Sequence, residues 1–136
     1  MGKSSVQVPE LSSVTLLQEV LKDDKKFSTV LLKAVDQALV ESLGATSTAV
    51  VKFYVDTTII VKEPRAFQEL LRRYFKGEEN GPDVLEKKIR WTLAGFLQIQ
   101  IDETMQTIPF TAFIDLCRNT IATRRASGWQ PTPVIC

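Results

Sequence analysis

Two adjacent segments between Glu63 and Leu97 repeat their apolar residues at the spacing of an amphipathic helix. The first segment opens at Pro64, and its apolar stripe comprises Phe67, Leu70, Leu71, Tyr74 and Phe75. After a short polar run, the second opens at Pro82, and its stripe comprises Leu85, Ile89, Leu93, Phe96 and Leu97. Two stripes so close in sequence are most easily buried against each other. The pattern therefore predicts an αα-hairpin within a helical protein, and it leaves the activity open.

Other segments have the same helical periodicity. A short helix is predicted over 12–22, and a longer one begins at Ser28 as N-cap and ends at Gly44. Residues 102–107 are predicted to form a loop. A last helix begins at Pro109, and its apolar stripe comprises Phe110, Phe113, Ile114, Cys117 and Ile121. We expect an all-α fold, a single compact domain of five to six amphipathic helices with a central αα-hairpin.

Residues 46–61 are ambiguous, because they are rich in β-branched residues and alternate in a way that favours a strand. The competing interpretation is a helix capped by Thr46 or Ser47. Its buried face would comprise Ala49, Val50, Phe53 and Tyr54. A lone strand would leave its backbone groups unpaired, since the other periodic segments are helical. We therefore predict a helix over 47–56 and an extended stretch over 57–62.

The chain length of 136 residues suits one domain. We expect a flexible N-terminus over 1–10, the helical domain over 11–126 and an irregular tail over 127–136, which contains two prolines and Trp129. No apolar run approaches the roughly 20 residues that span a bilayer, and the N-terminus does not resemble a secretory signal. A cytoplasmic location without membrane association is the expectation.

The chain contains no histidine, and this excludes several kinds of chemistry. Histidine is the commonest general base at neutral pH and the commonest metal ligand, so triad catalysis and histidine-containing zinc sites are excluded within one chain. The two cysteines, Cys117 and Cys136, are too few for a four-cysteine site, and a disulfide between them stays open. We expect no enzymatic activity, no catalytic residue, no metal and no cofactor.

Adjacent acidic residues are the remaining candidates for acid–base chemistry: Asp23-Asp24, Glu78-Glu79 and Asp102-Glu103. Each pair falls in a predicted polar connector, where desolvation is slight. Solvation of a connector therefore explains these pairs better than catalysis does.

Six cationic side chains form a candidate basic face: Arg72, Arg73, Lys76, Lys87, Lys88 and Arg90. Such a face suits phosphate contacts, but the sequence shows no helix-turn-helix spacing and no cluster of stacking aromatic residues beside it. A solvated face with the pairs Glu69–Arg73 and Glu86–Arg90 is the favoured interpretation. Trp129 either folds back onto the core, which is the favoured interpretation, or is exposed and contacts a partner.

Four motifs in the middle of the chain form a recognisable pattern: Glu41-Ser42-Leu43-Gly44, Val50-Val51-Lys52-Phe53-Tyr54, Pro64-x-x-Phe67-x-x-x-Leu71 with Phe75-x-Gly77, and Val84-Leu85-Glu86-Lys87-x-Ile89. Over residues 33–93, this pattern resembles the Nitrosopumilus output domain family. That archaeal family consists of small helical domains that occur alone or at the C-terminus of signalling proteins. Its members often carry a histidine where this chain has Val55. The resemblance implies a helix at 47–56, an archaeal source and a regulatory role, and it implies no catalytic residues.

We therefore expect a non-enzymatic regulatory, signal-output or protein-interaction module. The alternative is a nucleic-acid-binding protein that uses the basic face of the central hairpin. The expected contact residues are that basic face and Trp129. The protein partner is unknown, and a homodimer is one expectation, because five stripes exceed what one small core is expected to enclose. The stripe from Phe110 to Ile121 and Trp129 are the candidate interface.

Overall fold

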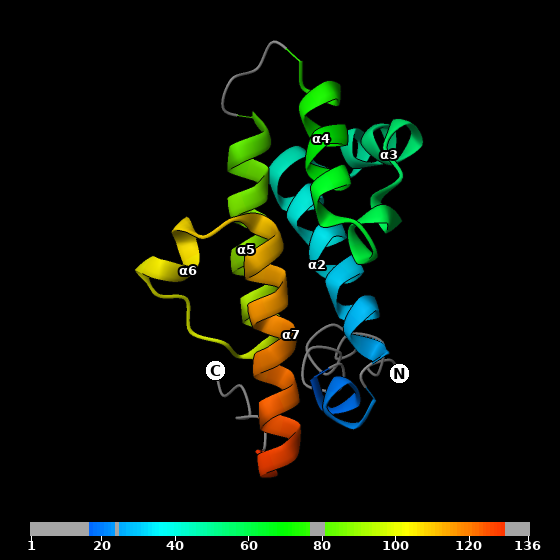
Figure 1. The fold of residues 1–136 in the computed structure, drawn as a ribbon. Helices are drawn as coiled ribbons and strands as arrows, with labels where there is room; N and C mark the ends of the chain where they lie inside the picture. The colour runs from blue at the N-terminus through cyan, green and yellow to red at the C-terminus, as the bar shows by residue number, and fades with distance from the viewer. Residues whose placement is uncertain (1–16, 24, 77–80, 130–136) are drawn as a thin grey trace, which may run out of the picture.

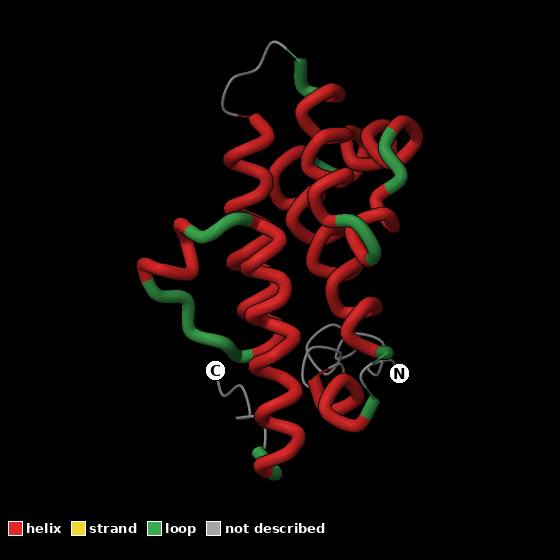
Figure 2. Tube along the Cα trace, viewed as in Figure 1, coloured by secondary structure: helices red, strands yellow, loops and turns green. Residues whose placement is uncertain are grey.

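The computed structural model describes residues 17–23, 25–76 and 81–129. These residues form helices and loops with no strand among them, so the all-α prediction is confirmed (Figure 2). A helical stretch at 17–22 comes first. It is followed by α2 (Lys26–Leu43), α3 (Ala45–Tyr54), the 3-10 helix η1 (Thr57–Val61), α4 (Pro64–Tyr74), α5 (Gly81–Leu97), α6 (Glu103–Thr107) and α7 (Phe110–Ser127). The predicted flexible N-terminus lies outside the described residues.

Helix α2 forms the centre of the bundle (Figure 1). Helix α5 packs along α2 in the most extensive helix contact of the described chain, and α3 and η1 also pack on α2. Helices α4 and α5 do contact each other, but the expectation that they mainly bury each other is wrong. The reason is that α2 provides a larger apolar surface for α5 than α4 does. Helix α2 buries seven residues, whereas α4 buries only Phe67 and Leu71.

Helix α7 closes the core by packing on α5 and α4 (Figure 1). The five residues of its predicted stripe are all buried within the domain: Phe110, Phe113, Ile114, Cys117 and Ile121. The helical stripe was therefore predicted correctly, but its role as a candidate interface is wrong. One chain encloses this stripe itself, because α4 and α5 together supply the apolar surface that covers it.

Several helix ends follow from local chemistry. Pro64 stands in the first turn of α4 and Pro109 precedes α7, as predicted. Gly44 separates α2 from α3 with φ of +88°, a conformation that glycine adopts without a side-chain clash. Ser28 is not the N-cap of α2, because the helix already begins at Lys26. Asp23 organises this start, since its carboxylate accepts from the amide of Lys25 and its carbonyl accepts from that of Lys26.

Two segments contain short helices that the sequence analysis missed. The predicted extended stretch over 57–62 is instead η1, and the predicted loop over 102–107 contains α6. In both cases an aspartate starts the helix: the side chain of Asp56 accepts from the amide of Thr58 at 3.1 Å, and that of Asp102 accepts from the amide of Met105 at 2.8 Å. These two helices raise the number of elements above the five to six expected.

Candidate functional site

Helix α3 turns its most hydrophobic side toward solvent. Its buried residues are Thr48 and Val51, and Val55 just beyond its end is also buried. The face predicted to be buried is the exposed one: Ala49, Val50, Phe53 and Tyr54. The choice of a helix over a strand is thus confirmed, at Ala45–Tyr54, whereas its orientation was predicted wrongly. Neither Thr46 nor Ser47 caps it, because the helix already begins at Ala45. In the observed orientation, Lys52 of α3 forms an ion pair with Asp36 of α2 at 2.8 Å.

Four rings meet where the C-terminal ends of α3 and α4 lie together. The ring of Phe53 packs edge-on against Tyr54 with centroids 5.0 Å apart, and Tyr54 lies 6.2 Å from Tyr74. Tyr74 in turn packs edge-on against Phe75 at 4.9 Å. These separations are typical of favourable aromatic contacts. We call Phe53, Tyr54, Tyr74 and Phe75 the aromatic face.

The aromatic face is half open to solvent. Phe53 is 81% exposed and Tyr54 is 69% exposed, while Tyr74 and Phe75 are partly buried against the core. Val50 extends the exposed surface one helical turn along α3. Large exposed apolar patches of this kind mark interaction sites, whereas single exposed residues do not. Sequence analysis missed Phe53 and Tyr54 as site residues, although α3 is apolar on more than one side, a pattern that suggests a second contact surface.

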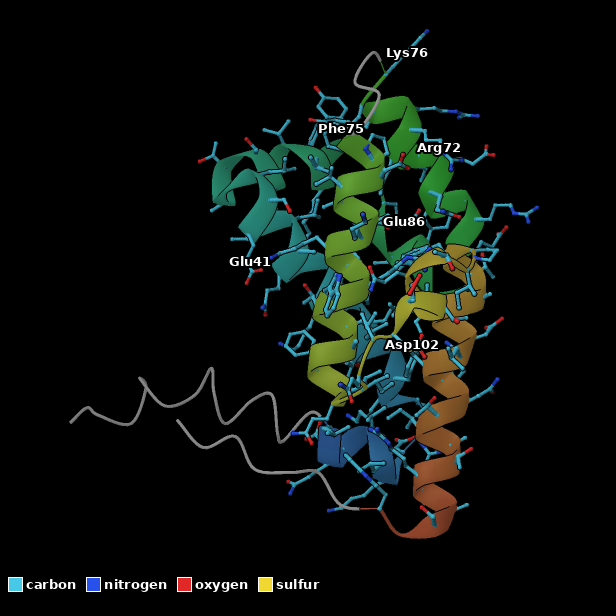
Figure 3. All side chains as sticks on the ribbon, turned by 90° about the vertical axis from the view of Figure 1, so that its left-hand side faces the viewer. Glu41, Arg72, Phe75, Lys76, Glu86 and Asp102 are labelled. Carbon is cyan, nitrogen blue, oxygen red and sulfur yellow. The ribbon has the colours of Figure 1, made fainter. Side chains whose placement is uncertain are left out.

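Three cations of the predicted basic face lie at the C-terminal end of α4, the end that carries Tyr74 and Phe75. Arg72 and Arg73 belong to the last turn of α4, and Lys76 follows it at the same end of the molecule (Figure 3). All three side chains are exposed. None of them forms an ion pair with a carboxylate of the described residues, and the predicted Glu69–Arg73 pair is absent there. The end of α4 that carries Tyr74 and Phe75 is therefore cationic, and its three cations lack an ion pair among the described residues.

The other three cations of the predicted face have different roles. Lys87 is exposed on α5, and Lys88 pairs with Glu41 of α2 at 3.0 Å. Arg90 is only 6% exposed, so its assignment to a surface is wrong. It forms the predicted ion pair with Glu86 at 3.0 Å, and this pair holds its guanidinium inside the bundle. The six cations therefore do not form one continuous binding surface.

Two of the grooves formed by the described residues lie beside α5. One, of about 500 Å³, is lined by residues of α2 and α5: Ser42, Asp83, Val84, Lys87, Lys88 and Trp91. The other, of about 610 Å³, lies between α4, α5 and the segment that leads into α7, and it contains both arginines and acids. Its charged residues are Arg65, Arg72 and Arg90 with Glu69, Asp83 and Glu86. Neither groove collects histidines or cysteines for covalent or metal chemistry.

The acidic pairs have structural roles where they are described. Asp23 and Asp102 accept hydrogen bonds at helix starts, and Glu103 is exposed. Asp24 and the pair Glu78-Glu79 lie outside the described residues. Within the described part of the chain, no three acidic or cysteine side chains gather closely enough to hold a metal ion.

Trp129 is docked on its own domain. The guanidinium of Arg124 lies over its indole at 4.0 Å from the ring centroid, and the ring packs partly buried against the core. The same guanidinium donates to the carbonyls of Leu97 and Gln98 at 2.7 and 3.0 Å. Trp129 thus follows the favoured interpretation that it folds back onto the core.

Comparison with known protein families, curated proteins and solved structures finds no match. The resemblance to the archaeal output domain family therefore stays a prediction. No helix among the described residues combines the length and apolarity needed to cross a bilayer.

Proposed function

We propose that this protein is a non-enzymatic interaction module that binds a protein partner through the aromatic face. One observation carries the proposal, namely the exposure of Phe53 and Tyr54 on a helix whose opposite side already fills the core. Exposing two adjacent rings costs free energy that burial against a partner recovers, at roughly 25 cal/mol for each Å² of apolar surface. A regulatory or signal-output role agrees with such a module and with the family resemblance.

Nucleic-acid binding is a second candidate function, because the fold brings together aromatic rings and cations that are not clustered in the sequence. Aromatic rings now lie beside exposed cations, and proteins that bind single strands combine these two features. The surface is small, however, since Arg90 is buried and Lys88 is paired with an acid. This candidate predicts binding that weakens steeply with salt and that requires Arg73 and Lys76.

Site-specific photo-cross-linking in cells tests the proposal. A benzophenone amino acid in place of Phe53 should form a protein adduct, whereas the same group in place of Leu116, an exposed residue of α7, should not. The partner identified by mass spectrometry is then purified, and its affinity is measured for the wild-type chain and for Phe53→Ser. We expect at least a tenfold loss, about 1.4 kcal/mol, on removal of the ring.

A matched variant, Leu116→Ser, should keep the full affinity for that partner, because its position on α7 lies outside the aromatic face. No adduct at position 53, or equal affinity of the wild-type chain and Phe53→Ser, would contradict the proposal. An adduct with nucleic acid in place of protein would favour the second candidate.

A further inference from the structure

We infer that the partner segment is an amphipathic helix whose apolar stripe is bordered by acidic residues. This inference rests on the proposed function and specifies the chemistry of what the aromatic face binds. It depends on two features of the surface, the spacing of its apolar side chains and the sign of the charges at its edge.

The exposed apolar residues of α3 have the spacing of a helix-packing ridge. Val50, Phe53 and Tyr54 fall at i, i+3 and i+4, so their side chains lie on one side of α3. Ridges with this spacing pack into the grooves of a second helix. The end of the ridge is supported from behind, because Tyr54 rests against Tyr74 of α4. A partner helix thus meets a preformed surface.

The second feature is the set of exposed cations at the end of α4, for which the described residues provide no ion pair. Arg72, Arg73 and Lys76 are exposed at the end of α4, where Figure 3 shows Lys76 extending away from the body of the molecule. One acid of α2 and one in the turn after α3 have contacts of their own. Asp36 pairs with Lys52, and Asp56 caps η1. Carboxylates on the partner would therefore meet cations that pair with no acid among residues 17–23, 25–76 and 81–129, and a basic partner would be repelled.

The same features favour a helix over a single nucleic-acid strand. A strand needs cations that follow its backbone past successive stacking rings. Here the three exposed cations of α4 cluster within residues 72–76, and Val50 at the other end of the ridge is aliphatic and offers no ring to stack on. The net charge of the whole chain is only +1, so little long-range attraction for phosphate exists.

Three labelled probes and the full chain test this inference by fluorescence anisotropy. The first is a peptide of about four helical turns with leucines at i, i+3, i+4 and i+7 and glutamates on both borders of this stripe. The second replaces each glutamate by lysine, and the third is an oligothymidylate. The glutamate peptide should bind at least about tenfold more tightly than the lysine peptide. Phe53→Ser should abolish this binding, and Arg73→Glu with Lys76→Glu should reverse the preference between the peptides.

Two matched variants control for non-specific effects. Leu116→Ser removes an exposed apolar side chain of α7, and Lys33→Glu reverses an exposed charge of α2, so both should bind like the wild-type chain. Circular dichroism and thermal melts establish that each variant is folded.

Four outcomes would overturn the inference. If both peptides bind equally and both need Phe53, the charge argument is wrong while the proposed function stands. If oligothymidylate binds and needs Phe53, the occupant is nucleic acid. If light scattering shows a dimer that Phe53→Ser dissociates, the occupant is a second copy of the chain. If no probe needs Phe53, the inferred chemistry is wrong, and the cross-linking experiment decides separately whether the face binds any protein.

Discussion

The guanidinium of Arg90 donates a hydrogen bond to the backbone oxygen of Met105 at 2.9 Å, which ties α5 to the short helix α6. The same side chain pairs with Glu86, and its central carbon lies 5.7 and 5.3 Å from the ring centroids of Phe110 and Phe113. A buried charge is tolerated when hydrogen bonds and an opposite charge replace water around it. Arg90 therefore belongs to the architecture of the bundle.

Replacing Arg90 by Met should destabilise the protein by about 1.5–3 kcal/mol, because the Met105 oxygen and the Glu86 carboxylate lose a charged donor. Urea unfolding at 25 °C measures this change. The matched variant Arg73→Met removes an exposed arginine that forms no ion pair with a described residue, and it should stay within about 0.5 kcal/mol of the wild type. Equal effects of the two substitutions would show that Arg90 is not held as described.

The two phenylalanines at the ends of the α4 stripe should differ in their contribution to stability. Phe67 is fully buried, so Phe67→Ala should cost about 3–5 kcal/mol. Phe75 was expected to be an equivalent core residue, but it is only partly buried within the aromatic face. Phe75→Ala should therefore cost clearly less in the same unfolding experiment. A larger loss at Phe75 than at Phe67 would contradict this order.

The junction between α2 and α3 should be sensitive to an added methyl group. Gly44 has φ +88° and ψ 163°, a combination available almost only to glycine, so Gly44→Ala should cost about 1–3 kcal/mol. No atom lies within 4 Å of the added carbon, so backbone strain is the cause. Gly95→Ala is the control, because Gly95 lies inside α5 with equally open space, and alanine there should stabilise by about 0.5–1 kcal/mol. Loss of stability in both variants would contradict the explanation.

Cys117 should be unreactive while the protein is folded. Burial raises the pKa of its thiol to about 12, although the charge of Arg90 acts in the opposite direction. In a Cys136→Ser background, Ellman's reagent at about pH 8 should label Cys117 only after denaturant is added. Rapid labelling of the native protein would contradict the burial.

The same thiol makes stability depend on alkaline pH. Because its folded pKa is raised, the folded state keeps the proton that the unfolded state releases, so stability is complete below about pH 9 and falls as the pH approaches 12. By about pH 10, the loss should be on the order of 1 kcal/mol. Urea unfolding of the Cys136→Ser chain over this range should show the decline, and the additional Cys117→Ala change should remove that part of it.

Regular apolar spacing made most of the fold predictable. The stripe of α7 and the prolines that start α4 and α7 are local signals, and both were interpreted correctly. The orientation of α3 was not predictable in this way, because Val50, Val51, Phe53 and Tyr54 place apolar groups on more than one side of the helix. Its packing on α2 buries Thr48 and Val51 and leaves the rings outside.

The burial of Arg90 could not be predicted from the sequence, for a related reason. Charged residues are usually exposed, and the rings that cover Arg90 follow it by some twenty residues in sequence. The carbonyl that accepts a hydrogen bond from Arg90 belongs to Met105 of α6. The only local signal for α6 is the side-chain cap that Asp102 provides at its start. Contacts between distant segments therefore decided which cations remain on the surface, and they also brought the rings of α3 beside α4.

Arg125 of α7 donates hydrogen bonds to the carbonyls of Leu21 and Val20, across 104 and 105 positions of the chain. Translation runs from the N-terminus, so these carbonyls are made long before the side chain that binds them. The helical stretch at 17–22 therefore lacks these two hydrogen bonds until the segment that contains Arg125 has left the ribosome. A nascent chain stalled before Arg125 should accordingly be cleaved by protease near residues 20–23, and extension through α7 should protect it.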